Sequence, residues 1–422
     1  MYKHLTFGKK LKDLAEEIEN KIAPIHHHME KVAEHNQYRV LESFQNMKVS
    51  DAHFIPSTGY GYDDMGRDTL ENIYAEAFGG EAALVRPQII SGTHAISTAL
   101  FGVLRPGDEL LYITGKPYDT LEEIVGIRGS GTGSLKEFGI SYHSVPLTKD
   151  RFVDFEAIVK AMNVHTKLIG IQRSKGYATR PSFTIAEIKE MIQFVKEINP
   201  EVVVFVDNCY GEFVEETEPC HVGADLIAGS LIKNPGGGLV KTGGYIVGKK
   251  NLVDACSYRL TSPGIGAEAG ASLYSLLEMY QGFFLAPHIV SQALKGAVFT
   301  AALLERLGMK TTPAWDAPRT DLIQSVQFGD RGKMVAFCQA IQYNSPVNSY
   351  VTPYPSYMPG YKDDVIMAAG TFIQGASIEL TADGPIRPPY EVYVQGGLTY
   401  AHVKIALLRA VDQLAEKGLL SI

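Results

Sequence analysis

The sequence has few of the features that mark secreted or membrane-bound proteins. Its four cysteines form no CxxC pair and are widely scattered, at Cys209, Cys220, Cys256 and Cys338. This spacing favours reduced thiols in the cytosol over a disulfide framework or a zinc site. No apolar run approaches the ~18 residues of a membrane-spanning helix, and the charged N-terminus lacks the apolar core of a signal peptide. We therefore expect a soluble cytoplasmic protein with no membrane partner.

An excess of positive charge is also missing. The formal net charge is -8 at pH 7, and the sequence pI is about 5.9. Nucleic acids and anionic membranes bind clustered positive charge, so we expect neither as the main partner. The chain does have size, because 422 residues of which 45% are hydrophobic can build one large domain or two to three ordinary ones.

Strand-like and helix-like segments alternate from about residue 70 to about residue 250. The strand-like segments include "AALVRPQII", "DELLYIT", "TKLIGIQ" and "EVVVFVDN", and the last is continuously apolar, as in a strand covered on both faces. Thr184 and Glu187 form a capping-box pattern at the start of one intervening helix. The alternation predicts an α/β fold, with a mostly parallel sheet and helices on both faces.

The two ends of the chain have a different character. Residues 8–48 read as amphipathic helix with an interruption at Pro24, and residues 54–68 read as a loop. Beyond about residue 290, a helix, a strand over residues 372–380 and a terminal helix followed by Gly418 predict a smaller α+β domain. We predict three parts: an N-terminal helical segment (1–57), a large α/β domain (58–288) and a small C-terminal α+β domain (289–422).

The stretch "DLIAGSLIKNPGGG" places one lysine, Lys233, after a short apolar strand and before a glycine-rich loop. Burial would lower the pKa of such a lysine toward values useful for imine chemistry. The simpler alternative is a strand-end lysine whose ammonium group reaches solvent.

Four other positions lie where ligands collect in an open α/β sheet. "SGTHAI", which contains Gly92 and Thr93, begins a helix and would offer backbone N–H groups to a phosphate, although an ordinary N-capped turn would look the same. Tyr118 follows a strand and would stack on a planar ligand, or else belongs to a surface turn. Asp207 closes an apolar strand and needs a cation or a ring N–H, unless it caps a turn.

These features, together with Ser230 and Lys233, form an ordered set. Pyridoxal 5'-phosphate (PLP) needs a phosphate cradle, a flat partner for its ring, a carboxylate for its pyridine nitrogen and a lysine for its aldehyde. The set therefore predicts a PLP enzyme. No G-x-G-x-x-G motif follows the first strand, which disfavours a nicotinamide dinucleotide enzyme.

Longer stretches resemble a known family. "STGYGYDDMGRDTLENIYAEAFGGEAALVRPQIISGTHAI", "LRPGDELLYITGKPYDTLEEI", "IQRSKGYATRPS", "DNCYGEF", "GSLIKNPGGGLVKTGGYIVG" and "RPPYEVYVQGGLTYAHVKIAL" are similar to the aluminium-resistance-associated carbon–sulfur lyases. These belong with the cystathionine and methionine lyases among the fold type I PLP enzymes. The resemblance implies a fold type I, transferase-like architecture with a sheet of the seven-stranded type.

The resemblance also implies roles for individual residues, which would together eliminate a thiol from cystathionine, cysteine or methionine. Lys233 would be the Schiff-base lysine and general base, Asp207 would pair with the pyridine nitrogen, and Tyr118 would stack on the ring and protonate the leaving thiol. The remaining implied contacts are phosphate binding by Gly92, Thr93 and Ser230, substrate carboxylate binding by Arg387, and contact from Tyr62 to a neighbouring subunit's phosphate in a homodimer or homotetramer. A link to aluminium resistance is implied only by the family name.

Three departures from the broad lyase pattern leave parts of this transfer open. Ile232 stands where a threonine precedes the lysine, and Asp64 stands where an interface arginine is expected, so that Arg67 is a candidate substitute. "IQRSKGYATRPS" replaces an asparagine–proline segment and contains Lys175, a rival imine-forming lysine.

Several alternatives remain at this point. A PLP-dependent aminotransferase or aldolase would use the same fold and lysine, and so would a PLP-binding protein with little catalysis. His26, His27 and His28 are consecutive, so on a helix they point in different directions and we expect no metal site. Cys209 and His94 lie near the predicted site but are as readily explained by packing.

Overall fold

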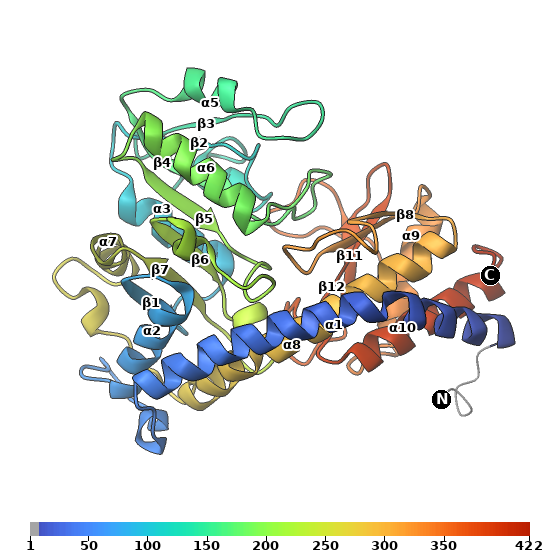
Figure 1. The fold of residues 1–422 in the computed structure, drawn as a ribbon. Coiled ribbons are helices and arrows are strands. Elements are labelled where there is room, and N and C mark those ends of the chain that lie inside the picture. Colours follow the sequence, from blue (N-terminus) through green and yellow to red (C-terminus); the bar gives the residue numbers. More distant parts are fainter. Residues whose placement is uncertain (1–7) are drawn as a thin grey trace. The chain divides into compact units, whose positions relative to one another are not determined.

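The computed structural model describes residues 8–422, which divide into two compact units (Figure 1). The large unit is Asn36–Leu285, and the small unit combines the described residues up to His35 with Ala286–Ile422. Two long helices, α1 (Lys9–Asn46) and α8 (Leu276–Arg306), contribute residues to both units. The division into domains at residues 58 and 289 stays a prediction from the sequence.

The large unit contains a seven-stranded sheet in the order β1-β7-β6-β5-β4-β2-β3. Strand β7 is antiparallel to both of its neighbours, and the other pairs are parallel, which confirms the α/β prediction. Its elements are α2 (Met65–Phe78), β1 (Ala82–Arg86), α3 (Gly92–Val103), β2 (Glu109–Tyr112), α4 (Leu121–Val125), β3 (Ser141–Ser144), α5 (Phe155–Ala161), β4 (Thr166–Gln172), α6 (Ile185–Ile198), β5 (Val203–Asp207), β6 (Leu226–Ser230), β7 (Gly244–Gly248) and α7 (Lys250–Leu260).

Helices cover both faces of this sheet. Alternate strand residues such as Leu110, Phe205 and Ile246 form one buried cluster with apolar side chains of α3, α4 and α7. On the opposite face the ring of Tyr74 in α2 lies 6.0 Å from that of Tyr245 in β7. Because both faces are buried, the central strands can be continuously apolar, as the sequence of β5 indicates.

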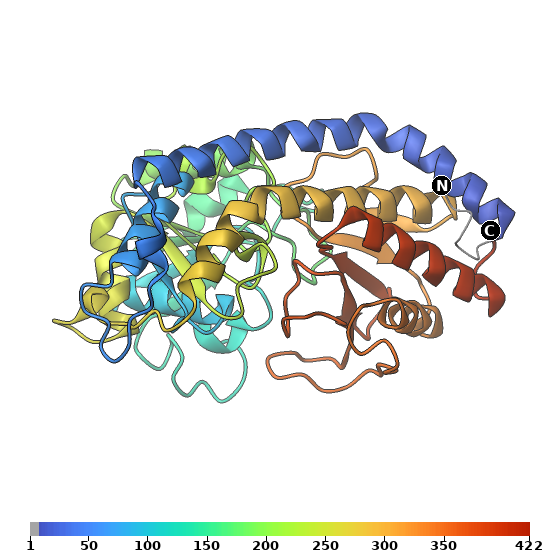
Figure 2. The same ribbon diagram turned by 90° about the horizontal axis from the view of Figure 1, so that it is seen from below.

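The small unit contains a five-stranded antiparallel sheet in the order β10-β11-β12-β9-β8. Its elements are β8 (Lys310–Thr312), β9 (Gln324–Gln327), α9 (Arg331–Tyr343), β10 (Val365–Ala368), β11 (Thr381–Pro385), β12 (Glu391–Gln395) and α10 (Tyr400–Glu416). Figure 2 shows α10 beside the second half of α8, where the Gln292 side chain accepts a hydrogen bond from the Tyr400 amide at 3.1 Å. The predicted α+β character of this region is confirmed.

Two local predictions are wrong. Pro24 does not interrupt the N-terminal helix, because α1 continues through it and buries residues on both sides, among them Ile22 and Met29. No strand forms over residues 372–380: the backbone N–H groups of Phe372 and Ile373 donate instead to the Glu379 carboxylate, at 2.9 and 3.0 Å. A side chain thus satisfies the donors that a neighbouring strand would otherwise pair.

Candidate active site

The carboxyl ends of the parallel strands bring several of the predicted site residues to one edge of the large sheet. Asp207 ends β5 and pairs in register with Gln172 at the end of β4 and with Ala228 in β6. Ser230 is the last residue of β6, and Lys233 follows three residues later in the loop before β7. The sheet topology therefore places the acid at the end of β5, and the hydroxyl and the lysine at and just after the end of the adjacent strand β6.

The start of helix α3 lies against the same edge. Ser91 caps the helix by accepting a hydrogen bond from the His94 amide at 3.1 Å. A Cβ atom on Gly92 would lie 3.2 Å from both the Cys209 sulfur and the Ser230 Cβ, so a larger residue would crowd this close approach. The N–H groups of the first turn, at the positive end of a 12-residue helix, suit an anionic group.

Lys233 lies half-buried among acidic and aromatic groups. Its Nζ atom is 4.0 Å from the centre of the Tyr210 ring. Burial acts to lower the pKa of Lys233, but Cys209, Tyr210, Asp207 and Glu212 outweigh it and raise the pKa above its ordinary value. The expected lowering by desolvation is therefore wrong for this structure, because the lysine is surrounded by groups that favour its charged form.

Asp207 is buried, with an exposed fraction of 6%. Burial raises the pKa of Asp207, while Lys233 and the hydrogen bond from the Cys209 amide, at 3.2 Å, oppose that rise. Within residues 8–422, Asp207 forms no ion pair within 4.0 Å, so its charge is only partly compensated by the chain. Such a carboxylate would gain from a further N–H donor.

Tyr118 and Thr93 belong to a second group at the same edge. The Tyr118 ring lies 6.0 Å from the Tyr177 ring, and a Cβ atom on Gly176 would lie 2.7 Å from it. The hydroxyl groups of Thr93 and Thr120 are 3.0 Å apart. Tyr118 thus contacts the "IQRSKGYATRPS" segment, which approaches the sheet edge here.

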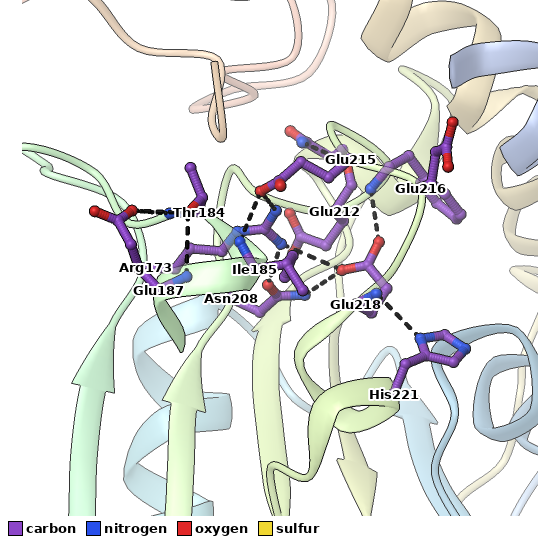
Figure 3. A network of polar contacts seen from close by, with 12 residues as sticks. Arg173, Thr184, Ile185, Glu187, Asn208, Glu212, Glu215, Glu216, Glu218 and His221 are labelled. Atoms are coloured by element: carbon purple, nitrogen blue, oxygen red, sulfur yellow. Dashed lines mark hydrogen bonds and ion pairs between the residues drawn. The ribbon is translucent and has the colours of Figure 1, made fainter. Parts of the chain in front are cut away.

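Arg173, in that segment, points away from solvent into a buried polar network (Figure 3). Its guanidinium group donates to Asn208 Oδ1 at 2.9 Å and to Glu215 Oε1 at 3.1 Å. Glu218 Oε2 lies 3.4 Å from Arg173 Nη1 and also accepts a hydrogen bond from Asn208 Nδ2 at 3.0 Å. Arg173 therefore joins the segment after β4 to the loop after β5, residues 208–218.

Three other sequence candidates have different surroundings. Lys175, the rival lysine, is buried, and its amide donates to Ser182 Oγ at 2.9 Å. Tyr62 is 56% exposed and stacks on Tyr60, with ring centres 5.4 Å apart. Arg387 belongs to the small unit, where it pairs with Asp363 at 3.0 Å.

Arg67, the candidate substitute for an interface arginine, contacts residues of the large unit, to which it belongs. Its guanidinium group donates to the carbonyl oxygens of Gly61 and Gly270 and pairs with Asp68. These contacts fix the loop that precedes α2, and they leave the Arg67 side chain only 3% exposed.

Sequence reasoning missed two residues beside Lys233. Tyr210 and Glu212 both belong to "DNCYGEF", a stretch from which only Asp207 and Cys209 were singled out. Their role depends on the loop conformation, for which the sequence offered only Gly211 as a signal. Neither residue has the strand-end position that identified the others.

Among residues 8–422, no group of three or more histidine, cysteine or acidic side chains could hold a metal ion, and no helix is long and apolar enough to cross a membrane. The consecutive histidines diverge as the helical geometry predicts. His26 is partly buried against Tyr400, whereas His27 and His28 are exposed. Burial lowers the pKa of His26 to about 4.

The lysine and the buried acid lie at the carboxyl edge of a doubly covered α/β sheet, where proteins of this fold class bind their ligands. Comparisons with known proteins show the family to which the chain belongs. The chain belongs to the methionine gamma-lyase family, whose model matches residues 11–415. This confirms the family resemblance drawn from the sequence motifs.

Individual relatives agree with that family. The chain is 73% identical over 421 residues, all of both chains, to YnbB of Bacillus subtilis (strain 168), which is named only as an uncharacterized protein. It is 47% identical to a solved structure from Clostridium novyi NT, a carbon-sulfur lyase involved in aluminum resistance, with a TM-score of 0.94 and 98% of each chain covered. It is also 29% identical to the L-methionine gamma-lyase of Pseudomonas putida over 222 residues. This matched region covers 51% of this chain and 48% of the Pseudomonas putida protein.

Proposed function

We propose that this protein is a PLP-dependent carbon–sulfur lyase that eliminates a thiol from a sulfur amino acid, such as cystathionine, cysteine or methionine, to give a keto acid and ammonia. The observation that carries the proposal is the position of Lys233 beside Asp207 at the carboxyl edge of the sheet, in a chain of the methionine gamma-lyase family. The link to aluminium resistance rests only on the name of a relative.

The residues present fit PLP. Asp207 is a buried carboxylate that the chain itself compensates only partly, and a protonated pyridine nitrogen would complete its pairing. The first-turn N–H groups at Gly92 and Thr93, beside Ser230, would hold a phosphate. When bound, PLP supplies an electron sink for the charge left after loss of the α-proton.

The chain's own groups would handle binding and proton transfer. Lys233 would carry the cofactor and, once displaced by the substrate amine, would accept the α-proton at Nζ. Tyr118 would stack on the ring and deliver a proton to the departing sulfur. Arg387 would bind the substrate carboxylate through its planar fork of donors, in place of its contact with Asp363.

The reaction can be identified from its keto acid. Purified protein loaded with PLP would be incubated separately with cystathionine, cysteine and methionine. Pyruvate would establish β-elimination, and 2-oxobutyrate from cystathionine or methionine would establish γ-elimination. Transamination would instead require an acceptor keto acid, and aldol cleavage would release an aldehyde. No keto acid from any of the three, with cofactor bound, would contradict the proposal.

The lysine assignment has its own test. Lys233→Ala should abolish turnover, and borohydride reduction of the unmutated protein should leave the cofactor attached to the peptide that contains Lys233. Lys241→Ala is the matched control, because Lys241 is close in sequence but 73% exposed and paired with Glu278. A reduced cofactor found on Lys175 instead, or substantial multi-turnover activity of Lys233→Ala, would refute the assignment.

We also propose that the protein acts as a homodimer or homotetramer in which Tyr62 reaches a neighbouring subunit's phosphate. What supports this is the exposure of Tyr62 on a segment joined to a second exposed loop. The Gly270 amide donates to the Tyr60 carbonyl at 2.8 Å, and the Leu273 amide donates to the Ser57 carbonyl at 3.1 Å. The large apolar residues exposed on these segments and beside them include Ile55, Tyr60, Tyr62, Met65, Leu273 and Tyr274.

A further inference from the structure

The backbone of Tyr210 has a conformation that is unusual for an aromatic residue. Its φ angle is +72°, in the left-handed region that normally favours glycine. Bulky residues persist there only when the surrounding structure imposes the conformation, and such residues cluster at functional sites. The structure around Tyr210 must therefore impose this conformation.

The side chain of Tyr210 contacts Lys233. The Nζ atom lies 4.0 Å from the centre of the Tyr210 ring, within the range in which a cation is attracted to the ring face. Both side chains are half-buried, so water screens this attraction less than it would at the surface.

The loop that carries Tyr210 is fixed on one side by Arg173, as Figure 3 shows. The Arg173 amide donates to the Asp207 carbonyl at 3.1 Å, and its guanidinium group contacts Asn208 and Glu215. Gly211 packs directly on this side chain: a Cβ atom there would lie 2.5 Å from Arg173 Cδ. The residue after Tyr210 is thus pressed against an arginine that is itself fully buried.

On the other side, the loop is held by the end of α1 that belongs to the large unit. Asn36 Nδ2 donates to the carbonyl oxygens of Phe213 and Glu215, at 3.0 and 3.1 Å. Arg39 Nη1 donates to the Glu216 carbonyl at 3.0 Å. The loop is therefore clamped from two elements, which explains how Tyr210 can remain in a strained conformation.

We propose that Tyr210 is a positioning residue for Lys233, whose ammonium form it holds against its ring face. The proposal rests on the function proposed above in that it takes Lys233 as the residue that bears the cofactor. When Lys233 accepts the α-proton, the C–H electron pair stays on the substrate and Nζ becomes an ammonium group. The Tyr210 ring then stabilises that group where it forms, ready to return the proton.

The test uses the full-length protein stripped of cofactor. The rate at which acetic anhydride acetylates Lys233 at pH 9 is followed by peptide mass spectrometry. Position 210 carries phenylalanine with zero, one, two or three ring fluorines, which weaken the ring's attraction for a cation while changing its size little. We expect the rate constant to rise stepwise along the series, by roughly threefold to tenfold in all, because less of the lysine is held as ammonium.

The controls separate this effect from access and from folding. Tyr210→Phe should match the unmutated protein within about twofold, since the ring face is kept. Tyr38→Leu should change nothing, because Tyr38 is 66% exposed on α1 and contacts Glu42. The titratable neighbours Cys209, Asp207 and Glu212 are the same throughout the series.

A flat fluorine series in folded protein would overturn the proposal, because it would mean that the ring acts only by its bulk. The result is independent of lyase turnover. A stepwise series in a protein that releases no keto acid would contradict the proposed reaction and leave the role of Tyr210 standing. A flat series in an active lyase would contradict the role of Tyr210 and leave the proposed reaction standing.

Discussion

Glu212 is a residue near Lys233 whose protonation is altered by its buried position. It is completely buried, its Oε1 accepts a hydrogen bond from the Tyr245 hydroxyl at 2.7 Å, and its Oε2 has no hydrogen-bond partner among the described residues. Burial raises the pKa of Glu212 from its ordinary value of 4.5 to about 8. The folded cofactor-free protein therefore holds a proton here over a pH range in which the unfolded chain has lost it.

This difference predicts a pH-dependent stability. The folded state binds the extra proton between pH 4.5 and about 8, so the contribution of Glu212 to the free energy of unfolding is largest below pH 4.5 and falls as the pH rises to about 8. Glu212→Gln, which stays neutral, should lose less stability than the unmutated protein between pH 6 and pH 9. Urea unfolding of both cofactor-free proteins at several pH values measures this. Equal losses would show that Glu212 ionises normally.

At the scale of elements, α1 shows how tertiary packing overrides a local signal. Pro24 lies inside this 38-residue helix and is exposed. Proline removes one backbone hydrogen bond and disfavours a helix interior by ~3 kcal/mol relative to alanine. The helix nevertheless continues, because apolar residues before and after the proline are buried, including Leu11, Ile18 and Val40.

Pro24→Ala should therefore stabilise the protein. We expect the free energy of unfolding to rise by about 1–2 kcal/mol, which is less than the full propensity difference because proline also restricts the unfolded chain. Chemical denaturation of the cofactor-free protein measures the change. His28→Ala, at an exposed position on the same helix, should change the stability by about 0.5 kcal/mol or less. A destabilised Pro24→Ala protein would show that the proline shapes α1 in a way the packing requires.

At the scale of the whole molecule, the exposed apolar residues near the start of α2 are the feature that a single chain leaves unexplained. Tyr60 and Tyr274 are 74% and 84% exposed, and the loops that carry them are hydrogen-bonded to each other. Exposed apolar side chains that gather in this way mark surfaces that another molecule covers. A second copy of the chain is the partner proposed above.

Light scattering coupled to size-exclusion chromatography tests this assembly. The unmutated protein should elute as a dimer or tetramer, and the Tyr60→Glu, Tyr274→Glu double variant should shift toward monomer, because two charges would be buried without partners. Phe152→Glu is the matched control, since Phe152 is 69% exposed in a different loop. A monomeric unmutated protein, or an equal shift in the control, would contradict an interface at these loops.

The sequence by itself determined the alternation of strands and helices, the parallel character of the sheet and the positions of Asp207, Ser230 and Lys233 at or just after strand ends. These features follow from hydrophobic period and from the order of residues along the chain, both of which are local. It also carried the family motifs, which the comparisons confirm. It did not predict the strands of the small unit, apart from one placed where none forms, because short strands on an antiparallel sheet depend on partners distant in sequence.

Only the tertiary structure decided what surrounds the lysine. Arg173 meets Asn208 and Glu215, which lie 35 and 42 residues away in sequence. That contact clamps the loop that holds Tyr210 beneath Lys233 and leaves Glu212 buried. The direction of the pKa shift of Lys233 depends on this arrangement, because desolvation alone would lower it and only the assembled neighbours reverse the sign.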